Sequence, residues 1–136
     1  MVASVLVDAG FLVALIERRE NHHIWAATLA DRMPPPWQTC DAVLSEVFHL
    51  TGELGFEAIT TLLRTEAVRS AFHASQGMTS VLELMEKYAD IPMSFADACL
   101  VRMTEILPDP MLLTTDSDFR IYRRLGRKAV PYLMPE

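Results

Sequence analysis

Short runs of apolar residues alternate along the chain with longer segments in which apolar residues recur at helical spacing. The first run, residues 2–7, is continuously apolar, which is typical of a strand buried on both faces in a parallel sheet. Similar short runs predict strands at residues 37–40, 68–72, 111–115 and 129–133. The chain is therefore expected to contain five short strands.

The segments between these strands carry apolar residues three or four positions apart, as an amphipathic helix does. Asn21 and Asp41 are candidate N-caps, and the prolines at 34–36 end the helix that follows Asn21. The expected helices are residues 11–17, 22–33, 42–54, 56–65, 79–89 and 94–107, followed by a short helix or turn at 117–125. Strands separated by helices predict an α/β sandwich with a mostly parallel sheet, in one domain over residues 1–136.

The composition fits a globular domain and narrows its class. Of 136 residues, 51% are hydrophobic and 22% are charged, which excludes a disordered chain. Twelve Lys and Arg against eighteen Asp and Glu give a net charge of −6. This balance argues against a protein that coats DNA through bulk positive charge.

The sequence predicts a cytoplasmic protein without a membrane segment. No apolar run approaches the roughly 20 residues that span a bilayer. No basic region precedes the apolar residues 9–16, as it would in a secretory signal. Cys40 and Cys99 form no CxxC motif, so both are expected to be buried free thiols in a reducing compartment.

Two acidic residues directly follow predicted strands. Asp8 comes after the strand at 2–7, and Asp116 comes after the strand at 111–115. In open α/β sheets, ligands bind outside the carboxyl ends of the strands, so these acids share one pocket if their strands are neighbours. The alternative is that each is only a helix cap or a turn residue, positions that Asp favours.

Two further acids lie on predicted helices. Glu46 is at the edge of the apolar stripe of the helix at 42–54, where it can point into a cleft at the sheet rim; the alternative is a solvated helix face. Ser94 and Asp97 match the S-x-x-[DE] capping box, so capping alone would explain Asp97. The two roles are compatible, because a first-turn acid projects toward the rim where the strand-end acids are expected.

Four carboxylates at one rim would repel one another unless a hard cation neutralised them. Mg²⁺ and Mn²⁺ take oxygen ligands, and Mg²⁺ is often held by one or two carboxylates together with substrate phosphates. Such a cation activates water and neutralises developing charge in phosphodiester hydrolysis. The acids therefore predict a Mg²⁺ or Mn²⁺ site with phosphodiesterase chemistry.

Four motifs around these acids resemble those of the PIN-domain family of nucleases, and in particular the small bacterial toxins of the VapC type. The motifs are VLVDAGFLVAL, TCDAVLSEVFHL, MSFADACLVRM and LLTTDSDFRIYRRLG, and the final VPYLMP matches the closing strand of the family. The resemblance covers nearly the whole chain, with the motifs in the family's order. It implies a three-layer α/β/α sandwich whose five-stranded parallel sheet places the first and fourth strands side by side.

The resemblance also implies the roles of particular residues. It assigns catalysis and metal binding to four acids: Asp8, Glu46, Asp97 and Asp116. Asp118 would be an additional metal ligand, and Thr114 would orient a carboxylate or a water on the metal. One departure is Gly10, because many members carry a hydroxyl residue at this position. The missing hydroxyl removes a local hydrogen bond near Asp8 but no metal ligand.

A basic segment follows Asp116. Five of its residues are positively charged: Arg120, Arg123, Arg124, Arg127 and Lys128. One interpretation is an RNA-binding rim, with Arg120, Arg123 and Arg124 leading phosphates to the metal. The other is a solvated helix that balances the acids.

Together these features predict a metal-dependent endoribonuclease that is the toxin component of a toxin–antitoxin pair. RNA, an antitoxin protein and a second copy of the chain are the expected partners, with residues 56–63, Leu82 and Met85 as a candidate dimer face. Two other functions stay open at this point. One is a non-catalytic interaction module with the same fold, and the other is a nuclease that acts in RNA processing or on DNA.

Overall fold

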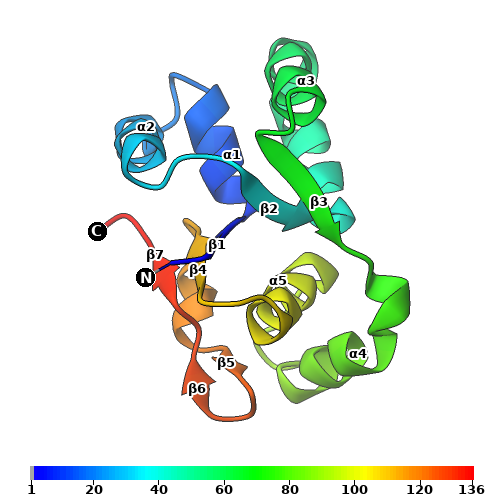
Figure 1. Cartoon of the computed structure of the whole chain (residues 1–136). Helices are drawn as coiled ribbons and strands as arrows, with labels where there is room; N and C mark the ends of the chain where they lie inside the picture. Colours follow the sequence, from blue (N-terminus) through cyan, green and yellow to red (C-terminus); the bar gives the residue numbers. More distant parts are fainter. Residues whose placement is uncertain (1) are drawn as a thin grey trace.

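The computed structural model describes residues 2–136. Its elements alternate between strands and helices, so that the chain returns repeatedly to one central sheet (Figure 1). In chain order the elements are β1 (Ser4–Val7), α1 (Ala9–Ile16), α2 (His23–Arg32), β2 (Trp37–Cys40), α3 (Asp41–Arg64), β3 (Val68–Phe72), the 3₁₀ helix η1 (Ala74–Gln76), α4 (Met78–Lys87), α5 (Phe95–Ile106), β4 (Pro110–Leu113), the 3₁₀ helix η2 (Ser117–Arg120), β5 (Arg123–Arg124), β6 (Lys128–Ala129) and β7 (Tyr132–Leu133).

Five strands form one parallel sheet in the order β3-β2-β1-β4-β7. β1 lies at its centre and pairs with β4 in a register that places Val7 opposite Leu113. α1, α2 and α3 lie on one side of the sheet, and α4 and α5 lie on the other (Figure 1). The predicted α/β/α sandwich with a five-stranded parallel sheet is confirmed.

The central strands are buried because helices pack against both faces of the sheet. Leu6, Val7, Leu112 and Leu113 have no exposed surface, as their continuously apolar runs predict. Polar residues begin where these strands end, with Asp8 after β1 and Thr114 after β4. The apolar core therefore fixes the strand ends on which the candidate site is built.

Two further observations concern the cysteines and the helices of residues 2–136, the range that the structure describes. Cys40 and Cys99 are buried and are not joined by a disulfide. No helix in this range is both long and apolar enough to cross a membrane.

The two helices expected at 42–54 and 56–65 form one element, α3, with a kink. Gly52 has φ = 63° and ψ = −156°, values outside the helical region. Glycine adopts a positive φ without the steric cost that a Cβ atom brings, so the helix bends at this residue and then continues.

Two helix caps differ from the sequence prediction. Asn21 is expected to cap α2, but the N-cap position is His22, which makes no side-chain cap bond. α3 begins at Asp41 itself, so Cys40 takes the N-cap position. The side chain of Asp41 instead accepts a hydrogen bond from the Ser70 hydroxyl on β3, which ties the start of α3 to the sheet.

The segment at 117–125 corrects the expectation of one short helix or turn. η2 ends at Arg120, and β5 then pairs antiparallel with β6 in a small hairpin. Leu125 and Gly126 in its connection have φ = 52° and 83°, backbone values that a helix cannot contain. The strand expected at 129–133 is accordingly divided between β6 in the hairpin and β7 in the main sheet.

Candidate metal centre

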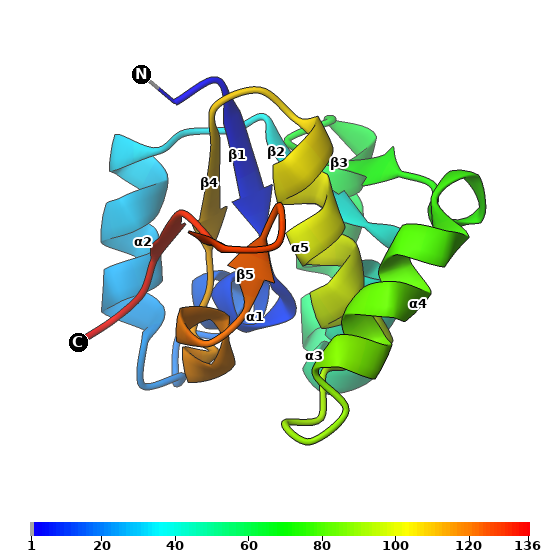
Figure 2. The ribbon, with the colours of Figure 1, turned by 90° about the horizontal axis from the view of Figure 1, so that it is seen from below.

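Three aspartates meet at the carboxyl ends of β1 and β4. Asp8 follows β1 and Asp116 follows β4, and these strands are neighbours in the sheet. Asp97 lies in the first turn of α5, which begins at the same end of the sheet (Figure 2). One carboxylate oxygen from each of the three lies within 4.8 Å of the others. The structure thus brings together three of the four acids that the sequence assigns to one site.

Asp8 is the most buried of these acids, with 6% of its surface exposed. Its Oδ1 accepts a hydrogen bond from the backbone N–H of Ala9 at 2.6 Å, and its Oδ2 accepts one from the Thr114 hydroxyl at 2.7 Å. Burial and, to a smaller extent, the charges of Asp97 and Asp116 raise the pKa of Asp8 to about 7. The carboxyl group is therefore fixed in orientation, but its ionised form is costly without a counter-charge.

Thr114 connects the two strand-end acids. Its buried hydroxyl donates to Asp8 Oδ2 and accepts a hydrogen bond from the backbone N–H of Asp116 at 3.0 Å. Asp116 Oδ1 in turn accepts from the backbone N–H of Asp118 at 2.9 Å and so caps η2. The cap role that the sequence offers as an alternative for Asp116 is therefore present together with the cluster.

Asp97 also combines a cap with the cluster. Its backbone N–H donates to Ser94 Oγ at 3.0 Å, and the backbone N–H of Ser94 donates to Asp97 Oδ2 at 3.4 Å, which completes the predicted capping box. Burial raises the pKa of Asp97, and the nearby charge of Asp116 raises it further. Capping alone does not account for the position of Asp97 within 4.8 Å of two other carboxylates, so Asp97 is both a helix cap and a member of the cluster.

Sequence reasoning missed Tyr122, which donates a hydrogen bond to the carboxylate of Asp97. Its hydroxyl donates to Asp97 Oδ2 at 3.1 Å, and its ring is fully buried. The ring packs edge-on against Phe119 and Tyr88, with centroids 5.2 and 5.1 Å away. The three-residue spacing of Phe119 and Tyr122 was the only signal in the sequence, and it indicates burial of aromatic rings rather than contact with an acid.

The three aspartates open onto a pocket of about 440 Å³. Glu46 on α3 and Asp118 on η2 line the same pocket but stand outside the group of three. Glu46 is exposed, and none of the hydrogen bonds found within residues 2–136 involves its carboxylate. The predicted acids thus form a tight group of three aspartates with two further carboxylates on the surrounding wall.

This donor set fits a hard divalent cation. Carboxylate oxygens are the ligands that Mg²⁺ and Mn²⁺ take, and three of them converge here within 4.8 Å. The raised pKa of Asp8 shows what the cluster costs in the absence of a cation, because burial and mutual repulsion disfavour its ionised form. A divalent cation would offset both effects.

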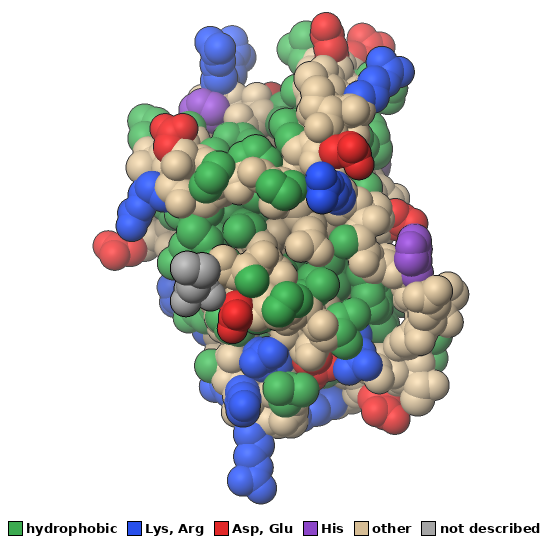
Figure 3. Space-filling view, in the orientation of Figure 1, with side chains coloured by type: hydrophobic (Ala, Val, Ile, Leu, Met, Phe, Trp, Pro, Cys, Tyr) green, Lys and Arg blue, Asp and Glu red, His purple; other side chains and the backbone are tan. Residues whose placement is uncertain are grey.

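The basic segment has structural contacts that the sequence does not predict. The Arg123 guanidinium donates to the carbonyls of Arg120, Ile121 and Tyr122 at 2.8, 3.2 and 3.0 Å, and the Arg124 guanidinium donates to a carbonyl of α5. The interpretation of this segment as a helix is wrong, because Arg123 and Arg124 form the strand β5. Lys and Arg side chains gather at the end of the molecule where β5 and β6 lie (Figure 3).

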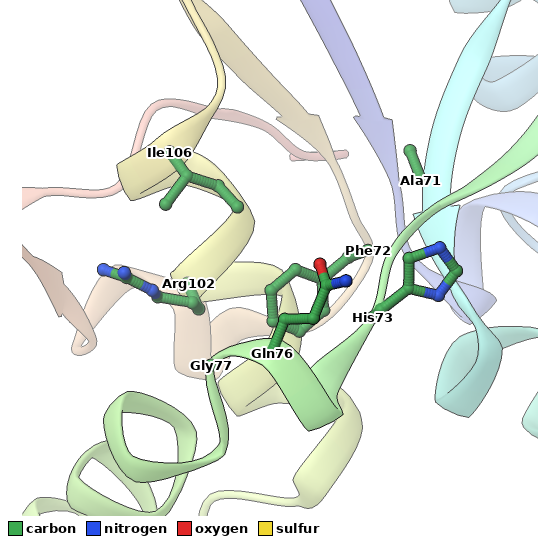
Figure 4. A pocket seen from close by; sticks show the side chains of 7 residues that line it. All are labelled: Ala71, Phe72, His73, Gln76, Gly77, Arg102 and Ile106. Atoms are coloured by element: carbon green, nitrogen blue, oxygen red, sulfur yellow. The ribbon is translucent and has the colours of Figure 1, made fainter.

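A second pocket lies between α5 and the segment of β3 and η1 (Figure 4). It is smaller, about 220 Å³, and its wall includes His73, Gln76 and Arg102. Arg102 is paired with Glu105 at 3.2 Å, which compensates its charge. None of the acids assigned to the site lines this pocket, so the candidate chemistry belongs to the three aspartates.

A comparison with models of protein families identifies the family of the chain. The chain matches the family model described as PIN domain over residues 5–125, a range that contains every acid of the pocket. A comparison with curated proteins finds no match. Because the family model covers most of the chain, and the parallel sheet and acidic cluster fit it, the chain belongs to the PIN domain family, whose members are generally metal-dependent nucleases.

Proposed function

We propose that the chain is a metal-dependent endoribonuclease that hydrolyses RNA phosphodiesters at the pocket of Asp8, Asp97 and Asp116. The proposal rests on the three carboxylates, which lie within 4.8 Å of one another in a chain of the PIN domain family. Glu46 and Asp118, on the wall of the same pocket, are proposed as further metal ligands. Mg²⁺ or Mn²⁺ is the proposed cofactor, because every donor is a carboxylate oxygen.

A divalent cation in this pocket supplies activation of water for in-line attack and neutralisation of charge on the phosphate. The chain's own part is to hold the acids in place. Hydrogen bonds from Thr114 and from the backbone of Ala9 orient Asp8, and Tyr122 orients Asp97. Because these acids are fixed before the substrate binds, little reorganisation of the site is needed. No nucleophilic side chain is required, because water is the attacking group.

The main test compares RNA cleavage by the wild type and by Asp97→Asn, with and without Mn²⁺. Asparagine keeps an oxygen for the capping box but removes the negative charge, so it separates capping from metal binding. We expect Mn²⁺-dependent cleavage by the wild type that disappears with EDTA, with Asp97→Asn and with Asp8→Asn. Asp31→Asn, at an exposed position of α2, is the matched control and should cleave as the wild type does.

Metal binding is measured separately through thermal stability, because a ligand that binds only the folded state raises the melting temperature. A protein that neither gains stability from Mn²⁺ nor cleaves RNA would favour the non-catalytic interaction module. Cleavage that persists in EDTA and in Asp8→Asn would contradict the metal-dependent mechanism.

We also propose that the enzyme is the toxin component of a toxin–antitoxin pair and that it forms a homodimer. The resemblance of its motifs to VapC-type toxins supports this part. Leu50, Leu54 and Phe56 on α3 are 60%, 90% and 57% exposed, a degree of apolar exposure that supports contact with a protein partner. Within the candidate dimer face, however, Ile59 has no exposed surface and belongs to the core, whereas Leu82 is 47% exposed.

Expression in a bacterial host tests the toxin role, and light scattering tests the dimer. Growth arrest that is relieved by a small gene adjacent to this one is the expected result. RNA cleavage without growth arrest would favour a nuclease in RNA processing. Phe56→Asp should shift a dimer toward the monomer, and a monomeric wild type would remove the homodimer from the proposal.

A further inference from the structure

Thr115 and Gly10 interlock on the wall of the acidic pocket. Gly10 lies in the first turn of α1, and Thr115 directly precedes Asp116. A Cβ atom on residue 10 would lie 2.0 Å from Thr115 Oγ1 and 3.2 Å from Thr115 Cβ, the first of which is closer than real Cβ atoms pack. The Thr115 hydroxyl therefore fills the space that a side chain at position 10 would occupy, and glycine is needed there to leave that space.

The Thr115 hydroxyl is available to a ligand. Both Thr115 and Gly10 line the pocket of the three aspartates. Within residues 2–136, Thr115 Oγ1 takes part in no hydrogen bond and is not sealed from solvent. By contrast, the Thr114 hydroxyl donates to Asp8 Oδ2, and the Ser94 oxygen is held in the capping box as the acceptor of the Asp97 N–H.

The charged side chains on the rest of the wall are acceptors rather than donors. Its charged side chains are Asp8, Glu46, Asp97, Asp116 and Asp118, and no Lys, Arg or His of the described chain lines it. An ionised carboxylate only accepts hydrogen bonds, and the same holds for the non-bridging oxygens of a phosphodiester. A hydroxyl on this wall that has no partner within residues 2–136 is therefore complementary to a phosphate.

We propose that the Thr115 hydroxyl donates a hydrogen bond to a non-bridging oxygen of the bound phosphodiester. This inference rests on the proposed function, because it requires the phosphate to lie in the pocket of the three aspartates. Thr115 then contacts the substrate directly, whereas Thr114, its neighbour in sequence, orients Asp8 and connects it to Asp116. Position 10 has no hydroxyl, and the Thr115 hydroxyl occupies the space that a side chain at position 10 would fill.

Two substitutions test this contact. Thr115→Val keeps the branched shape and removes the donor, whereas Thr115→Ser keeps the donor. We expect Thr115→Val to lower kcat/KM for RNA roughly 10- to 100-fold, the effect of one hydrogen bond to a charged group, and Thr115→Ser to stay within about threefold of the wild type.

A binding measurement separates the phosphate from the metal. Adenosine 5′-monophosphate carries non-bridging phosphate oxygens, and its affinity in the presence of Mn²⁺ can be measured by calorimetry. Thr115→Val should weaken this affinity by a factor similar to its loss in kcat/KM. The affinity for Mn²⁺ without the nucleotide should remain that of the wild type.

A pair of double variants tests whether the place of the hydroxyl matters more than the residue that carries it. Gly10→Ser with Thr115→Ala moves the hydroxyl to the α1 side of the same space. Gly10→Ala with Thr115→Ala is the matched control, because it fills the space without a donor. We expect the serine variant to bind the nucleotide and to cleave RNA several-fold better than its alanine control.

Equal nucleotide affinity and equal kcat/KM in the wild type and in Thr115→Val would overturn the inference. A loss of Mn²⁺ affinity in Thr115→Val would also overturn it, because the hydroxyl would then act on the metal. If the wild type neither binds Mn²⁺ nor cleaves RNA, the proposed function fails instead. Melting temperatures verify folding, and Thr115→Ala replaces Thr115→Val if the valine variant does not fold.

Discussion

The two walls of the acidic pocket are built in different ways. On one wall, Asp8, Asp97 and Asp116 receive hydrogen bonds from neighbouring residues and are wholly or partly buried. On the other wall, Glu46 stands exposed on α3. The chain thus fixes one part of the candidate metal site in advance and leaves another part to be positioned by its ligands. Substitutions on the first wall should change stability as well as activity, whereas those on the second should change activity alone.

The largest effect is expected for Asp8→Asn, on the fixed wall. The substitution removes a proposed ligand charge at the centre of the cluster, which should lower RNA cleavage by about 1,000-fold or more. It also removes a buried carboxylate, so the metal-free variant should unfold at a higher temperature than the metal-free wild type at pH 8. Cleavage assays and thermal melts in EDTA measure the two effects, and a variant that loses stability while keeping activity would contradict both.

The pH dependence of stability sharpens the same comparison. The pKa of Asp8 rises to about 7 in the fold, compared with about 4 in an unfolded chain. Without metal, its contribution to the free energy of unfolding is therefore fully present below about pH 4 and is lost as the pH rises through about 7. The loss, on the order of 4 kcal/mol, should appear in urea titrations of the wild type and be absent in Asp8→Asn.

Glu46→Gln should have a smaller effect and affect activity only. Because the side chain is exposed, its replacement should change the metal-free stability by less than about 0.5 kcal/mol. We expect cleavage to fall roughly 10- to 100-fold through weaker metal binding, with partial recovery at high Mn²⁺. A variant that loses stability in EDTA would show that the second wall contributes to the fold as much as the first does.

The smallest of these effects is expected for Tyr122→Phe, which keeps the buried ring and removes the hydrogen bond to Asp97. We expect a loss of about 1 kcal/mol of stability and a reduction in cleavage of up to about tenfold, because Asp97 is then less well oriented. Tyr88→Phe is the matched control, since the Tyr88 hydroxyl accepts a hydrogen bond from the Arg123 backbone rather than touching an acid. If Tyr122→Phe and Tyr88→Phe have equal Mn²⁺ affinity, Tyr122 does not position Asp97 for metal binding.

The sequence predicts the positions of Asp8, Asp97 and Asp116, because each is marked by a pattern of neighbouring residues. Asp8 and Asp116 end apolar runs, and the ends of parallel strands are where an α/β sheet binds ligands. Asp97 stands three residues after Ser94, a spacing that places it in the first turn of a helix. These patterns locate the acids without any knowledge of side-chain contacts.

Three other features could not be predicted from the sequence, because they depend on contacts between distant segments or on backbone conformation. Tyr122 meets Asp97 across 25 positions, and nothing local distinguishes it from any other core tyrosine. Arg123 and Arg124 lie in a helical-looking polar segment, yet the positive φ values of Leu125 and Gly126 turn it into a hairpin. In the sequence, Gly10 stands out only because it lacks a hydroxyl. In the structure, the space beside Gly10 is filled by the side chain of Thr115, more than 100 positions away.

The central place of β1 in the sheet has a consequence for the synthesis of the protein. β1 is made first, but its neighbour β4 comes late, and the hydrogen bond between Asp8 and Thr114 spans 106 positions. At roughly 5–20 residues per second, the ribosome adds Thr114 about 5 to 20 s after Asp8. A growing chain that already holds Asp8, Glu46 and Asp97 still lacks Asp116 and the strand that carries it. The acidic cluster, and with it the proposed activity, therefore forms only after Asp116 has been synthesised and β4 has paired with β1.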